Sequence, residues 1–138
     1  SPAELRGKSI GVTSLASAGV VVARAQVAAA GLDPAKDVQI VVAGEGAQTA
    51  AMVRNKQVEA LSQFDTQYAM VENSGVKMRY LDRKAIEKFP GNGFLALEES
   101  LKSRRKDLVA LGRAYAKGTI FTINNPEAAV GFVCGKIS

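Results

Sequence analysis

The stretch that decides the fold is Lys8-Ser9-Ile10-Gly11-Val12, followed by Thr13-Ser14-Leu15-Ala16-Ser17 and then by residues 18–30. The first five residues form a short apolar run after a glycine, which predicts a strand. The next five are small and mostly polar, which predicts a loop. Alanine and apolar residues then recur at helical spacing up to Gly31, a residue type that commonly follows the last helical turn. Strand, loop and helix in this order open a β-α-β unit.

The same order repeats twice more along the chain. Residues 38–42 and 60–64 predict strands, residues 48–56 and 67–73 predict the helices that follow them, and residues 76–81 predict a fourth strand. Successive strand–helix units of this kind predict an α/β fold, in which helices cover both faces of a parallel sheet and the crossovers are right-handed.

The pattern changes after this region. Residues 82–88 are mostly charged, and residues 89–93 form a turn cluster rich in proline and glycine. Residues 94–97 predict a brief strand, and from about Glu98 onwards the chain predicts helices only.

Two helices are expected in this last part, one over residues 108–123 and one that starts again at Pro126. Asn125 is expected to be the N-cap of the second helix, with Pro126 at the first helical position. The long helix carries an apolar stripe that needs a covering partner, and nothing that follows in the sequence supplies one. The stripe consists of Leu108, Leu111, Tyr115 and Thr119 or Ile120.

Composition excludes several classes of function. Of 138 residues, 47% are hydrophobic and 22% are charged, which is typical of a globular protein. The chain has no histidine and a single cysteine, Cys134, so it predicts no internal disulfide, no common metal site, no histidine acid–base chemistry and no cofactor. No apolar run approaches the roughly 20 residues that span a bilayer. The first residues do not form a signal peptide, as would also be true of a processed exported protein.

The net charge of +5 does not indicate nucleic-acid binding. Acidic residues lie among the basic ones throughout, and no reading helix or aromatic-rich basic surface is recognisable. We expect a solvated, mildly basic surface and no nucleic-acid partner.

Parallel sheets bind ligands at the carboxyl ends of their strands, where loops lead into helices. Three such loops are expected, over residues 13–19, 44–48 and 64–67, and they converge on one edge if the first three strands are neighbours. The candidate ligand-binding residues are Thr13, Ser14, Ser17, Ala18 and Gly19 in the first loop, Glu45 and Gly46 in the second, and Phe64 and Asp65 in the third.

The first loop offers hydroxyl groups and a helix N-terminus, which suit an anion or the partly negative oxygen of a neutral ligand. Ser14 or Ser17 could equally be no more than a helix cap.

The other two loops suit a different ligand chemistry. Glu45 could accept a hydrogen bond from an amine or a ring N–H, although the glycines beside it lack the spacing of a phosphate loop and fit a tight turn. Phe64 could form a flat apolar wall beside the acceptor Asp65, which could equally be the N-cap of the following helix.

Several stretches carry a family resemblance: residues 5–12 with the loop after them, residues 50–60, and residues 114–129. Together they resemble ABC-transporter substrate-binding proteins of the sulfonate, nitrate and thiamine-precursor type, the NMT1/THI5-like group. The resemblance implies a type II periplasmic binding protein with a parallel-sheet, three-layer lobe. Residues 1–95 would be its second lobe and residues 96–138 the hinge return, whose helices pack on the other lobe. The chain would then be a fragment that lacks the first lobe.

The resemblance further implies a periplasmic solute-binding protein and not an enzyme, which closes around a small organic or anionic solute and delivers it to a membrane permease. It marks Ser14, Ser17, Ala18 and Gly19, together with Phe64–Asp65, as ligand residues. The pyrimidine-synthesising enzymes of the family use a histidine, which this chain lacks. Two other classes stay open: the effector-sensing domain of a transcription regulator with the same fold, and a small flavodoxin-like enzyme.

Overall fold

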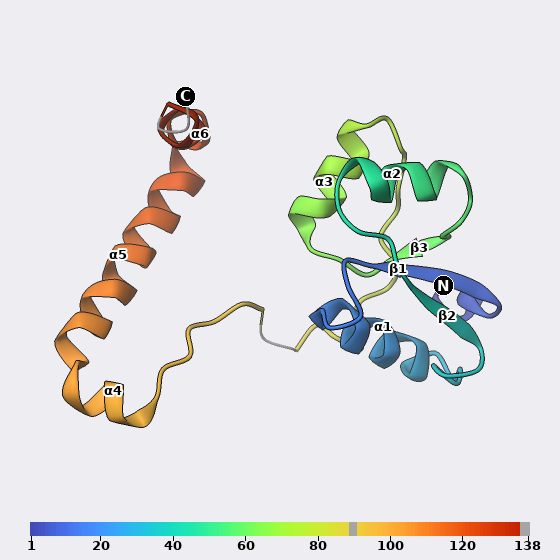
Figure 1. Cartoon of the computed structure of the whole chain (residues 1–138), viewed down its shortest axis with the longest axis horizontal. Helices are drawn as coiled ribbons and strands as arrows, with labels where there is room; N and C mark the ends of the chain where they lie inside the picture. The colour runs from blue at the N-terminus through green and yellow to red at the C-terminus, as the bar shows by residue number, and fades with distance from the viewer. Residues whose placement is uncertain (89–90, 136–138) are drawn as a thin grey trace. The chain divides into compact units, whose positions relative to one another are not determined.

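The structure, a computed structural model, describes residues 1–88 and 91–135. The chain divides into two units, Ser1–Pro90 and Gly91–Ser138 (Figure 1). The first unit is α/β, and the second is helical. We describe each unit by itself, and the assignment of residues 1–95 and 96–138 to two parts of a larger protein stays a prediction.

The first unit contains a three-stranded parallel sheet in the order β2-β1-β3. In the register, Lys8 lies opposite Val38, and Ile10 lies opposite both Ile40 and Ala60. The parallel α/β class that the sequence predicts is therefore confirmed. The elements are the 3-10 helix η1 (Pro2–Leu5), β1 (Lys8–Val12), α1 (Ala18–Ala29), β2 (Val38–Val42), α2 (Ala47–Arg54), β3 (Ala60–Leu61) and α3 (Asp65–Asn73).

Helices cover both faces of this sheet, with α1 on one side and α2 and α3 on the other (Figure 1). The layer beneath α1 holds the main core cluster, which consists of Leu5, Ile10, Ala23, Val27, Leu32 and Val38. At Gly11 the packing is so close that a Cβ atom would lie 2.8 Å from the Cβ of Ala43 and 2.9 Å from Cδ2 of Leu61. The small residue in the middle strand therefore allows its neighbours to close over it.

Two predicted strands are absent from the described residues: neither residues 76–81 nor residues 94–97 pair with another strand. Apolar residues alternate in the first of these segments, which is the pattern of a half-buried strand, but a strand also needs a partner edge. The neighbouring edge strand β3 is only two residues long, against the five predicted for it, and supplies few free backbone groups. Side-chain contacts hold the segment instead: the Tyr80 ring lies edge-on to Tyr68 at 6.1 Å, and Arg83 lies 5.4 Å from the centre of the Tyr80 ring.

The ends of the helices follow recognisable capping patterns. After α1, Gly31 has φ +77°; its N–H bonds to the Ala28 carbonyl at 2.9 Å, and the Leu32 N–H bonds to the Val27 carbonyl at 3.2 Å. This is the Schellman arrangement, and it confirms the predicted position of Gly31. After α2, Lys56 adopts the same left-handed conformation, with φ +56°.

The second unit consists of α4 (Glu98–Ser103), α5 (Arg105–Asn124) and α6 (Pro126–Cys134). The predicted long helix and the restart at Pro126 are both confirmed. Asn125 is the N-cap by position, but its side-chain amide donates to the Phe121 carbonyl at 3.2 Å instead of capping α6. Within the described part of this unit only Ala129 is buried, and no described helix is long and apolar enough to cross a membrane.

Candidate functional site

The three predicted loops meet at the carboxyl edge of the sheet. The strands β2, β1 and β3 are parallel neighbours, so the segments after Val42, Val12 and Leu61 leave the sheet in the same direction. The expectation that these loops converge on one edge is therefore met, with the loop after β1 in the middle.

The first and third loops are joined by a close contact between Gly19 and Ser62. The Ser62 hydroxyl donates to the Gly19 carbonyl at 2.8 Å, and a Cβ atom at position 19 would overlap the Ser62 carbonyl oxygen. Gly19 is thus required where the start of α1 approaches the end of β3. This packing role accounts for the glycine without a ligand.

The second and third loops are joined through Gln63, whose side-chain N–H donates to the Gly44 carbonyl at 2.8 Å. The buried Thr49 supports the same turn by donating its hydroxyl to the Ala43 carbonyl at 3.1 Å. Ser62 and Gln63 were predicted only as strand residues. The signal that could have identified them is the pair of polar residues that ends an otherwise apolar run.

Tyr68 fixes the conformation of the third loop. Its hydroxyl oxygen accepts from the backbone N–H of Gln63 at 2.9 Å and lies 3.5 Å from the Leu61 carbonyl. Burial raises the pKa of this phenol, because the charged form would lose its hydration. Tyr68 therefore stays a neutral hydrogen-bonding group that holds the loop leading into α3.

Each of the helices α1, α2 and α3 begins at this edge, and within the described chain none of them has a side-chain hydrogen bond at its N-cap. The N-caps are Ser17, Gly46 and Phe64. Ser17 instead donates its hydroxyl to the Ser14 carbonyl at 2.7 Å, so the interpretation of these serines as a helix cap is wrong. The first turns of the helices leave their N–H groups available for a ligand.

Asp65 is the first residue of α3 and not its N-cap, as one interpretation of the sequence had it. Its carboxylate accepts from the Thr66 backbone N–H at 2.8 Å and is exposed. At this position the charge also complements the positive end of the helix dipole. A structural role and a ligand role remain compatible for this carboxylate.

The candidate residues differ in how far they can reach a ligand. Phe64 is 45% exposed, and the neighbouring apolar Leu15 in the first loop is 65% exposed. Gly46 is buried, has φ +54°, and leaves room for the Met70 methyl group, so it serves the tight turn at the start of α2. The other exposed candidates are Ser14, Ala18, Glu45 and Asp65, and the half-buried ones are Thr13, Ser17 and Gly19.

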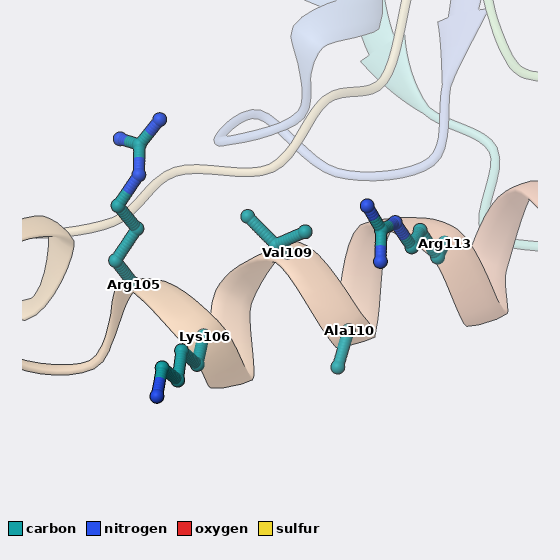
Figure 2. A pocket seen from close by; sticks show the side chains of 5 residues that line it. All are labelled: Arg105, Lys106, Val109, Ala110 and Arg113. Carbon is teal, nitrogen blue, oxygen red and sulfur yellow. The ribbon is translucent and has the colours of Figure 1, made fainter.

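Two other possible sites show no such convergence. Among the described residues, no group of three or more His, Cys, Asp or Glu side chains could hold a metal ion. A shallow hollow of about 290 Å³ lies along α5 and is lined by Arg105, Lys106, Val109, Ala110 and Arg113 (Figure 2). Lys106 and Ala110 point to the opposite side of the helix from Arg105 and Val109, so these side chains do not surround a common ligand position (Figure 2).

A family model described as NMT1/THI5 like matches residues 1–129. The chain belongs to this family. NMT1/THI5-like proteins are mostly solute-binding proteins, typically periplasmic or extracellular, although THI5 itself is a thiamine-pyrimidine synthase. The α/β sheet and its helices are consistent with one lobe of a periplasmic binding protein.

A solved structure of a protein from Bordetella bronchiseptica RB50 is 36% identical to this NMT1/THI5-like chain, with a TM-score of 0.48. The match covers 54% of this chain and 23% of the other, so the chain spans less than a quarter of that relative's length. No curated protein matches the chain.

Proposed function

We propose that this chain is part of the solute-binding component of an ABC-type importer, and that it binds a small organic or anionic solute at the carboxyl edge of its sheet. The observation that carries the proposal is the meeting of three helix N-termini without side-chain caps at that edge. Exposed Phe64 and Leu15 beside them offer apolar surface to the same ligand. The family, whose members mostly bind solutes, supports this assignment.

The energies favour a site that is shared with a second lobe. One helix N-terminus contributes about 0.3–1 kcal/mol to binding an anionic group, and about 2 kcal/mol when partly buried. Micromolar affinity needs about 8 kcal/mol, so a single lobe is insufficient. In the proposed mechanism the first lobe of the same protein closes over the edge, and the solute stabilises the closed state because it contacts both lobes.

The remaining parts of the proposal follow from this mechanism. The helices of residues 96–138 pack on the first lobe, which covers the apolar stripe of α5. The closed protein delivers its solute to a membrane permease at the periplasmic face. Binding and release require no catalytic group, so we propose transport and not an enzymatic reaction.

The experiment is solute binding by the full-length protein with Asp65 replaced. A thermal-shift screen of sulfonates, carboxylates and heterocycles identifies a ligand, and isothermal titration measures its affinity. We expect Asp65→Ala to weaken binding at least tenfold. The matched control is Glu72→Ala at the other end of α3, which should leave the affinity unchanged. Equal affinities for Asp65→Ala and the unaltered protein would show that Asp65 only supports its helix.

A further inference from the structure

Two side-chain oxygens in the third loop lack a hydrogen-bond partner in the part of the chain that the structure describes. They are Oε1 of Gln63 and Oε1 of Gln67, and both are closed to solvent. Buried polar atoms are nearly always paired, because a donor or acceptor that has lost its water without gaining a partner destabilises the fold. Two such acceptors within five residues of one loop therefore call for a specific explanation.

The position of Gln63 is central to the carboxyl edge. Gln63 follows β3, and its amide nitrogen reaches the Gly44 carbonyl that follows β2, while β1 lies between these two strands in the sheet. This bond also fixes the orientation of the amide, because a reversed amide would set its oxygen against the Gly44 carbonyl oxygen. The unpaired atom is therefore an acceptor whose identity is determined by its neighbour.

Gln67 lies in the first turn of α3, at the same edge of the sheet. Its backbone N–H is bonded to the Phe64 carbonyl at 3.0 Å, so the residue moves with the third loop. The side chain as a whole is half-buried, although its oxygen is closed to solvent. Rotation about the terminal torsion of glutamine has a broad energy well, so the oxygen can turn to the accessible side when a donor arrives.

We propose that the oxygens of Gln63 and Gln67 are acceptors for the bound solute, which therefore carries N–H donors, as a carboxamide or an amino-substituted ring does. This inference rests on the proposed function and narrows its solute class. A simple oxyanion brings only acceptors and would set lone pairs against these oxygens. An N–H donor satisfies them, and the N–H groups of the helix N-termini stay available for an oxygen or ring nitrogen of the same solute.

The test uses the full-length protein and pairs of probes that differ by one donor group. The probes are nicotinamide with nicotinate, benzamide with benzoate, and methanesulfonamide with methanesulfonate, measured by isothermal titration at neutral pH. We expect the amide of at least one pair to bind at least tenfold more tightly than its acid. Gln67→Met removes the acceptor at similar size and should abolish this preference, while the unliganded protein melts at the same or a higher temperature.

Two further variants separate a ligand role from a structural one. Gln67→Glu keeps an acceptor and adds a negative charge, so it should retain amide binding and weaken acid binding further. Gln39→Met makes the same change as Gln67→Met on an exposed residue of β2 and should leave the preference intact. Tighter binding of the acids, or an amide preference that survives in Gln67→Met, overturns this inference and leaves the proposed function standing. Binding of no probe by the unaltered protein overturns both.

Discussion

At the scale of single residues, Gly19 and Ser62 show how one contact sets the distance between two binding loops. The Ser62 hydroxyl donates to the Gly19 carbonyl, and position 19 has no room for a methyl group. The sequence predicts Gly19 as a ligand residue because it lies in a small polar loop after a strand. The structure adds a reason for the glycine that depends on β3, 43 residues further along the chain.

Gly19→Ala is therefore expected to be strongly destabilising. The added methyl group meets the Ser62 backbone carbonyl, which cannot move without displacing the end of β3, so we expect overpacking to cost about 1–3 kcal/mol or more. Urea unfolding followed by circular dichroism measures this loss.

The comparison variant is Ser62→Ala, which removes the hydrogen bond but introduces no overlap. It should cost less, about 1 kcal/mol. A free energy of unfolding for Gly19→Ala within 0.5 kcal/mol of the unaltered protein would contradict the packing role of Gly19.

At the scale of elements, the ends of α1 and α2 use the same Schellman arrangement with different residues. After α2, the Lys56 N–H bonds to the Val53 carbonyl at 3.0 Å, and the Gln57 N–H bonds to the Met52 carbonyl at 2.9 Å. The residue in the left-handed conformation is Gly31 after α1 but Lys56 after α2. A side chain in that conformation costs about 1–2 kcal/mol, so α2 ends with local strain.

Lys56→Gly should relieve this strain. Glycine adopts the conformation freely but also gains freedom in the unfolded chain, so we expect a net stabilisation of about 0.5–1 kcal/mol. Thermal unfolding measures the change as a rise in melting temperature.

Gln57→Gly is the control, because Gln57 is the exposed neighbour and does not have a positive φ. This substitution should lower the melting temperature. A fall in melting temperature for Lys56→Gly would contradict the assignment of strain to this helix end.

The elements also show which parts of the fold can be predicted from the sequence. The strands β1 and β2 and the helix α1 follow from periodicity and from Gly31, because these signals are local. Residues 76–81 also have strand periodicity, yet they form no strand, because pairing depends on an edge that β3 is too short to provide. The third loop was the least predictable part of the site, since the bonds of Ser62 and Gln63 connect segments that are distant in sequence.

At the scale of the whole molecule, the second unit lacks a core of its own in the described residues. Leu111 is 53% exposed and Tyr115 is 60% exposed, although both lie on the apolar stripe predicted for this helix. Phe94 covers part of the Tyr115 ring, with ring centres 4.9 Å apart. A helix with this much exposed apolar surface needs a partner, and in our proposal the partner is the first lobe.

Leu111→Ala in the full-length protein tests whether the stripe is covered. If it is buried against the first lobe, the free energy of unfolding should fall by about 2–5 kcal/mol, as for other buried leucines. Lys117→Ala, on an exposed part of the same helix, should change it by no more than about 0.5 kcal/mol. Equal stabilities of the two variants would show that the stripe faces solvent in the full-length protein.

The measurement that tests the central claim most directly is native mass spectrometry of the gently purified full-length protein. The account predicts a small-molecule adduct that disappears on denaturation, and the mass of that adduct identifies the solute class. Absence of any adduct, together with no thermal shift from sulfonates, carboxylates, amides or heterocycles, would contradict the assignment of this chain to a solute-binding protein.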